Sequence, residues 1–167
     1  MSSPRPSSAP FKRPKLLLFI CTGNYYRSRF AEACFNHRAR HQGLPWRAIS
    51  RGFRVDWPGN IYPLSPYTRE AMQARGIAPE MTGPDKLRLT LRDLNACPRA
   101  IALKHGEHHP LMLKKFPKWA DRIEYWSVHD LDCAGPGETL ALIEEKVGSL
   151  LGELARNPSP KAATNQS

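Results

Sequence analysis

The stretch that most constrains this chain covers residues 15–32, KLLLFICTGNYYRSRFAE. Its apolar run, Leu16 to Ile20, has the length of a buried strand and stops at Cys21. The next residues, Thr-Gly-Asn, suit a tight loop because they tolerate unusual backbone angles. Ser28 then opens a helical pattern with apolar residues on one face. The stretch therefore predicts a strand, a tight loop and a helix, in that order.

Cys21 and Arg27 flank the five residues of this loop. A loop that leads into a helix forms an anion site, because its backbone N–H groups and the positive end of the helix favour negative charge. Such a site stabilises a thiolate at its rim and makes it a nucleophile near neutral pH. The planar guanidinium of Arg27 can bind two oxygens of one phosphate. The pattern predicts thiolate attack on phosphorus, with the loop amides and Arg27 holding the other oxygens.

Residues 20–29, ICTGNYYRSR, resemble the signature of the low-molecular-weight protein tyrosine phosphatases, Val/Ile-Cys-x-Gly-Asn-x-Cys-Arg-Ser-Pro. The resemblance implies that Cys21 is the nucleophile, that Arg27 clamps the phosphate and that Ser28 donates a hydrogen bond to the thiolate. Asn24 would shape the loop. The residues implied to bind phosphate or substrate are Thr22, Gly23, Asn24, Tyr25, Tyr26 and Ser28. Two residues depart from the signature: Tyr26 replaces its second cysteine and Arg29 replaces its proline.

The general acid of the family is an aspartate near the end of the domain, and Asp130 stands at its position here. Asp132, two residues further on, is the alternative. Leu131 replaces the proline that follows the acid in the family. Two more motifs differ, since residues 50–53 read Ser-Arg-Gly-Phe instead of Ser-Ala-Gly-Thr, and Lys104 replaces an aspartate after the third strand. The resemblance therefore implies a divergent branch of the family.

Predicted strands and helices alternate along the chain. We predict strands over Leu16–Ile20, Trp46–Ser50, Ala100–Leu103 and Ile123–Val128. We predict helices from Ser28 to Gly43, from a Ser65 cap to Ala74, as a capped turn at Thr90–Asp93, over His109–Phe116 and over Glu138–Arg156. The alternation indicates an α/β fold of three layers, a parallel sheet with helices on both faces. The resemblance implies four parallel strands in the order 2-1-3-4.

One domain is expected over residues 15–156. We predict that the basic segment 1–14 and the tail 157–167, both rich in proline and small polar residues, are disordered. No apolar run approaches the ~20 residues of a membrane helix, and the first residues lack the apolar centre of a signal peptide. Four scattered cysteines favour reduced thiols, so we expect a cytoplasmic protein without a membrane partner.

The formal net charge of +10 permits phosphorylated or nucleic-acid partners. With the loop motif, it favours a cysteine-dependent phosphatase acting on a phosphorylated protein or a small phosphate ester; nucleic acid is not the expected partner. Two alternatives stay open: a non-catalytic module that binds phosphate or nucleic acid, and an arsenate reductase, which shares this fold and loop but uses further close cysteines. The sequence leaves the oligomeric state open, and the substrate open between phosphotyrosine, phosphoarginine and a small ester.

Several other residues could carry chemistry. The segment His105–His109 contains three histidines and one glutamate, but no further ligand at a suitable spacing, so we predict a solvated loop and no metal or other cofactor. Cys34 falls on the apolar face of the first predicted helix and is expected in the core. Tyr25, inside the loop, and Trp57, after the second strand, are candidates for the wall of a substrate pocket.

Overall fold

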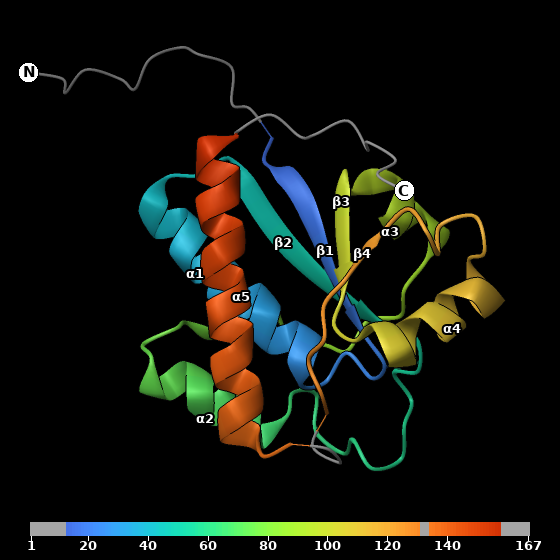
Figure 1. The fold of residues 1–167 in the computed structure, drawn as a ribbon. Helices are drawn as coiled ribbons and strands as arrows, with labels where there is room; N and C mark the ends of the chain where they lie inside the picture. The colour runs from blue at the N-terminus through green and yellow to red at the C-terminus, as the bar shows by residue number, and fades with distance from the viewer. Residues whose placement is uncertain (1–12, 131–133, 158–167) are drawn as a thin grey trace, which may run out of the picture.

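The computed structural model describes residues 13–130 and 134–157. Its sheet contains β1 (Lys15–Cys21), β2 (Trp46–Gly52), β3 (Arg99–Ala102) and β4 (Glu124–Tyr125). All neighbouring strands are parallel, and their order is β2-β1-β3-β4 (Figure 1). The predicted topology is confirmed. Most of the two terminal segments that the sequence predicts as disordered lies outside the described residues.

β1 is a central strand, so both of its faces are covered. Leu17 and Phe19 belong to one buried cluster and Leu18 and Ile20 to the other, and none of the four is exposed to solvent. Successive side chains of a strand point to opposite faces, so a strand that is covered on both faces is apolar at every position. This explains why the sequence shows a continuous apolar run rather than an alternation.

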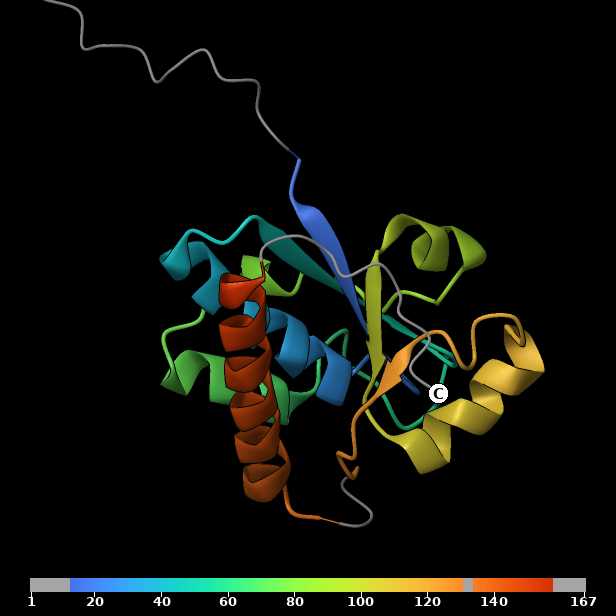
Figure 2. The same ribbon diagram turned by 45° about the horizontal axis from the view of Figure 1, so that its top comes forward.

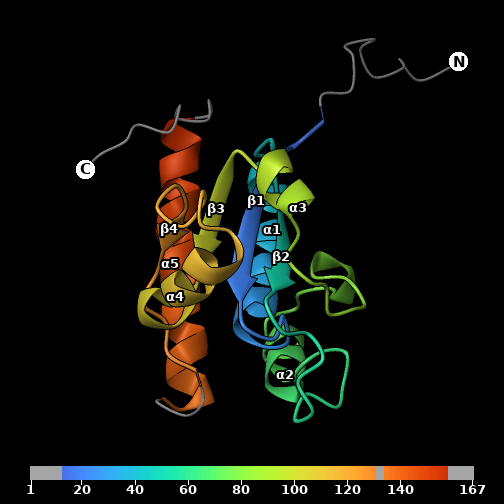
Figure 3. The same ribbon diagram turned by 90° about the vertical axis from the view of Figure 1, so that its right-hand side faces the viewer.

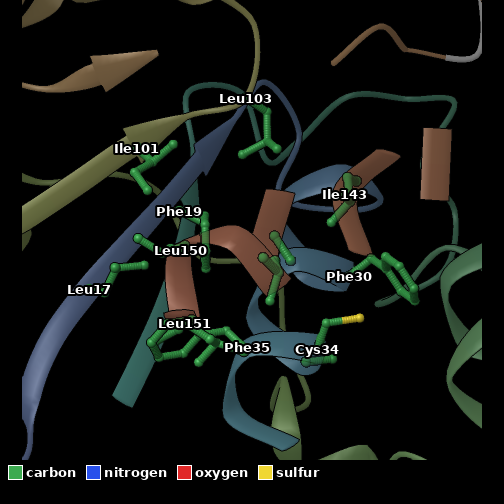
Figure 4. Close-up of a cluster of buried hydrophobic side chains, with 14 of the residues drawn as sticks. Leu17, Phe19, Phe30, Cys34, Phe35, Ile101, Leu103, Ile143, Leu150 and Leu151 are labelled. Carbon is green, nitrogen blue, oxygen red and sulfur yellow. The ribbon is translucent and has the colours of Figure 1, made fainter. Parts of the chain in front are cut away.

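Helices cover both faces of the sheet. On one face lie α1 (Arg27–Gln42), α2 (Pro66–Ala74) and α5 (Pro136–Arg156), and on the other lie α3 (Leu91–Ala96) and α4 (His105–Lys115) (Figure 2). A one-turn 3₁₀ helix covers Pro79–Met81. Figure 4 shows how side chains of α1 and α5 pack against β1 and β3. Cys34 lies in this core, as predicted, and burial raises the pKa of its thiol to about 12.

Some element boundaries differ from the sequence prediction. α4 begins at His105 instead of His109, so the predicted solvated loop is in fact the first turns of a helix. β4 is shorter than the predicted strand, because β3 ends at Ala102 and offers it few partners. The capped turn is confirmed: the Thr90 and Asp93 side chains form a reciprocal capping box at the start of α3.

The loops that follow β1 and β2 lie at the same end of the sheet, next to α2 (Figure 3). In a parallel sheet, ligands bind at the carboxyl ends of the strands, so the fold places the predicted anion loop at the usual ligand-binding edge. No helix in the part of the chain that the structure describes is long and apolar enough to cross a membrane.

Candidate active site

The anion loop, residues 22–26, is shaped by Asn24. Its φ angle is 51°, in the left-handed region that asparagine tolerates better than most residues. The Asn24 side chain donates hydrogen bonds from Nδ2 to Ser28 Oγ and to Ser50 Oγ, both at 3.0 Å. Its Oδ1 accepts a hydrogen bond from the Leu87 N–H at 2.8 Å. One buried side chain therefore ties the loop to α1, β2 and the segment before α3.

The carbonyl groups of the anion loop point outward. Thr22 O accepts a hydrogen bond from the Arg54 N–H at 2.7 Å, and Tyr25 O accepts one from the Ser65 N–H at 3.0 Å. In a planar trans peptide, the N–H of the following residue points to the opposite side. The amides of Gly23 and Tyr26 are therefore directed toward the inside of the loop, where they can bind an anion.

Gly52 allows the anion loop to pack closely on β2, and Gly23 leaves room for the Asn60 side chain. A Cβ on Gly52, which pairs with Cys21 in the sheet, would lie 2.6 Å from the backbone nitrogen of Asn24. A Cβ on Gly23 would lie 2.6 Å from Asn60 Nδ2. Real Cβ atoms do not approach other atoms so closely, so the loop can rest on β2 only because residue 52 has no side chain.

Cys21 lies at the end of β1 beside a cavity of about 360 Å³. The thiol is almost fully buried, and its Sγ lies 2.9 Å from Ser28 Oγ. The cavity is lined by Cys21, Gly23, Tyr25, Tyr26, Arg27, Gly59, Asn60, Ser65, Pro66, Tyr67 and Asp130. Several of the sequence-predicted site residues are thus brought together around one opening.

Arg27 is buried at the start of α1 and is held on two sides. Its Nη1 donates to the carbonyl of Val128 at 3.1 Å. Its Nη2 donates to Glu107 Oε2 at 2.5 Å and to Asp130 Oδ2 at 3.4 Å. Burial lowers the pKa of Arg27, but the nearby Cys21 and the two carboxylates outweigh it and raise that pKa. The guanidinium is therefore a permanent cation at the cavity.

Asp130 follows the fourth strand and reaches the cavity from the side opposite β2. Its carboxylate contacts Arg27, lines the cavity and is partly open to solvent. The sequence alternative, Asp132, lies outside the described residues, as do Leu131 and Cys133.

Glu107 and His108 were missed as site residues by sequence reasoning, which assigned their segment to a solvated loop. They lie in the first turn of α4, and Thr22 Oγ1 donates to Glu107 Oε2 at 2.9 Å. His108 is fully buried, with Nε2 3.1 Å from the Thr22 hydroxyl. The available signal was their place: they follow a strand at the ligand-binding edge of a parallel sheet. Within residues 13–130 and 134–157, no group of three or more possible ligands could hold a metal ion.

The aromatic candidates have different places. Tyr25 lines the cavity, and Lys86 Nζ lies 5.5 Å from the centre of its ring. Tyr26 also lines it but is largely buried; burial raises its pKa to about 12, and its hydroxyl donates to the Pro136 carbonyl at 3.4 Å. Trp57 is not among the lining residues and instead stacks on the guanidinium of Arg54.

The family model described as low molecular weight phosphotyrosine protein phosphatase matches residues 16–160. A search of curated protein sequences found no match. YfkJ from Bacillus subtilis has a similar structure, with a TM-score of 0.74 and 23% identity over 89% of this chain and 99% of that one.

Two further structures share the fold. The low molecular weight protein tyrosine phosphatase from T. tengcongensis has a TM-score of 0.70 and 23% identity, covering 84% of this chain and 99% of that one. A mutant of the arginine phosphatase YwlE with a phosphorylated active-site serine has a TM-score of 0.70 and 22% identity, covering 85% and 97%. From the family match over most of its length, this chain belongs to the low molecular weight phosphotyrosine protein phosphatases and is a phosphatase of that type.

Proposed function

We propose that this protein hydrolyses a phosphomonoester through a phosphocysteine intermediate on Cys21. The observation that carries the proposal is that the Cys21 thiol, the Arg27 guanidinium and the Asp130 carboxyl line one cavity. These groups supply a nucleophile, a clamp for the phosphate oxygens and an acid for the leaving group.

The reaction takes two displacements. In the first, the Cys21 thiolate attacks phosphorus, a P–S bond forms, and the P–O bond to the alcohol breaks as Asp130 protonates the leaving oxygen. In the second, the Asp130 carboxylate takes a proton from water, the water oxygen attacks phosphorus, and the P–S bond breaks to release inorganic phosphate and the thiolate. The inward amides and Arg27 stabilise the equatorial oxygens in both transition states.

Ser28 is suited to assist the thiolate. Its oxygen accepts a hydrogen bond from Asn24 Nδ2, so the serine proton is available for the Cys21 sulfur 2.9 Å away. A donor aimed at the sulfur favours the anionic form and makes it a better leaving group in the second displacement.

The substrate we propose is a phosphotyrosine of a polypeptide. Tyr25 and Tyr67 line the same cavity as Cys21, and aromatic side chains there could pack against a phenyl ring. Just outside, the loop between β2 and α2 exposes Ile61 and Tyr62, which are 76% and 51% open to solvent. A small ester would leave this apolar rim uncovered, whereas the chain on either side of a phosphotyrosine could pack on it.

Cys21→Ser tests the chemistry. Wild type should hydrolyse p-nitrophenyl phosphate, and Cys21→Ser should lose turnover while still binding inorganic phosphate. Equal turnover by both proteins would refute a cysteine nucleophile. Phosphate binding without turnover by wild type would instead support a non-catalytic phosphate-binding module.

A leaving-group series tests the acid. Asp130→Asn should slow alkyl phosphates by about 10²–10⁴-fold and spare activated aryl phosphates, because only poor leaving groups need a proton. Asp132→Asn is the matched control, two residues further along the chain. If Asp132→Asn shows this selectivity and Asp130→Asn does not, our assignment is wrong.

A substrate panel tests specificity. Peptides carrying phosphotyrosine, phosphoserine or phosphoarginine should be compared at equal length with a small aryl phosphate. We expect the highest kcat/KM for the phosphotyrosine peptide, and a selective loss for that peptide in Ile61→Ser. We also infer a reducing compartment such as the cytoplasm, because the described cysteines are all free thiols and the mechanism needs one.

A further inference from the structure

Glu107 joins the phosphate clamp to the anion loop through a single oxygen. Its Oε2 accepts hydrogen bonds from Arg27 Nη2 at 2.5 Å and from Thr22 Oγ1 at 2.9 Å, and it lies 2.7 Å from His108 Nε2. Thr22 is the first residue of the loop and Arg27 follows the last, and they stand 85 and 80 residues before Glu107 in the sequence. Glu107 does not line the cavity, so it contacts Arg27 and Thr22 from the side that faces away from the cavity.

His108 holds the carboxylate in place. Its Nδ1 accepts a hydrogen bond from the Lys104 backbone N–H at 3.0 Å, so in the neutral ring the proton is on Nε2, which faces Glu107. Burial lowers the pKa of His108, because the ring is fully enclosed and stacks on Phe53 at 5.9 Å. A neutral ring with a fixed tautomer donates one hydrogen bond and adds no charge of its own.

Glu107 is ionised in this setting. Burial raises the pKa of its carboxyl, but the His108 hydrogen bond and the Arg27 charge outweigh burial and hold that pKa well below its usual range. A carboxylate this close to an anion site repels phosphate. Glu107 therefore weakens the binding of phosphate in the ground state. Any benefit of Glu107 to the reaction must come from the position in which it holds the Arg27 guanidinium.

We propose that Glu107, oriented by His108, is a positioning residue that fixes the Arg27 guanidinium against the anion loop for the transition state. The proposal rests on the proposed phosphatase reaction. An arginine side chain has many rotamers, and a guanidinium that is already oriented loses less conformational entropy during reaction. Lys104 stands where the sequence resemblance implies an aspartate, and Glu107 places a carboxylate one helical turn later, on Arg27.

Two variants of Glu107 separate the effect of its position from the effect of its charge, and a third variant is the control. Glu107→Gln removes the charge and keeps the shape, whereas Glu107→Asp keeps the charge and moves the oxygen by one methylene. Glu144→Gln is the matched control, because Glu144 is similarly exposed and pairs with Arg75 and Arg38, which do not line the cavity. Melting temperatures show whether each variant folds, and kcat and inhibition by inorganic phosphate are then measured with p-nitrophenyl phosphate.

We expect kcat to fall about 10- to 100-fold in both Glu107 variants, the range set by misplacing a positioned group. Phosphate inhibition should tighten in Glu107→Gln, because a repulsive charge is gone, and should not tighten in Glu107→Asp. Glu144→Gln should change neither quantity. If Glu107→Gln does not fold, the kcat of Glu107→Asp still tests the proposal. A kcat within twofold of wild type in a folded Glu107 variant overturns the proposal.

A double-mutant cycle with Arg27→Lys tests whether Glu107 acts through Arg27. Once the guanidinium is gone, adding Glu107→Gln should lower kcat less than twofold further, because the two residues work as one unit. Effects that multiply in the double variant refute a role through Arg27. Turnover that does not depend on Cys21 in wild type would refute the proposed function itself, so the two failures are distinguishable.

Discussion

Replacing Glu32 by glutamine should remove a pH dependence of stability that originates beneath the active site. Glu32 lies on α1, only 7% exposed, and its Oε1 accepts hydrogen bonds from Ser50 Oγ and Thr82 Oγ1, both at 2.7 Å. Ser50 also accepts a hydrogen bond from Asn24, which contacts Ser28. A buried hydrogen-bond chain thus connects this carboxyl to Ser28, which faces the Cys21 sulfur.

The magnitude follows from the pKa of Glu32. Burial raises this pKa from 4.5 to about 7, and the hydrogen bonds from Thr82 and Ser50 only partly offset it. The folded state therefore holds a proton that the unfolded state releases. The contribution to the free energy of unfolding is full below about pH 4.5 and is lost as the pH rises through about 7. One pKa unit corresponds to about 1.4 kcal/mol, so the full effect is about 3 kcal/mol.

Urea unfolding of wild type and Glu32→Gln at pH 5, 6, 7 and 8 measures the effect. Relative to wild type, the variant should gain about 2–3 kcal/mol between pH 5 and pH 8, because glutamine keeps the acceptor and cannot ionise. Arg29, 4.0 Å away, attracts only the ionised carboxylate, and this attraction is already contained in the pKa of Glu32. A difference that does not vary with pH would refute the assigned proton.

Three further outcomes follow from the site. Gly52→Ala should destabilise the fold by about 1–3 kcal/mol and lower kcat/KM at least about tenfold, because the new Cβ would lie too close to the Asn24 nitrogen. Gly137→Ala, with open space around the new Cβ, is the control. Equal effects of the two substitutions would contradict the predicted clash. Iodoacetate should inactivate the enzyme and inorganic phosphate should protect it; inactivation that persists in Cys21→Ser would place the reactive thiol elsewhere. Strong peroxide should drive Cys21 to irreversible acids, while Tyr26→Cys should recover with dithiothreitol through a disulfide; full recovery of wild type would refute this.

The sequence alone determined the part of the site that is local. Cys21, the anion loop and Arg27 follow one another within a strand, a turn and a helix start, so their spacing already indicates the chemistry. The buried strand and the parallel topology followed in the same way, from the apolar run of β1 and the alternation of elements. Asp130 was predicted from the family resemblance, as the aspartate that follows the fourth strand, and the fold brings it into contact with Arg27.

Only the tertiary structure showed that Glu107 and His108 support Arg27 and the anion loop. Pro110 favours a helix start near residue 109, because proline suits the first helical turn. The helix begins at His105 instead, and Pro110 lies inside it. That earlier turn carries Glu107 and His108 to the anion loop, at a sequence distance of 85 residues or more from Thr22. No local pattern marks such a contact, because it exists only when packing sets β3 beside β1 and directs α4 across the carboxyl end of the sheet.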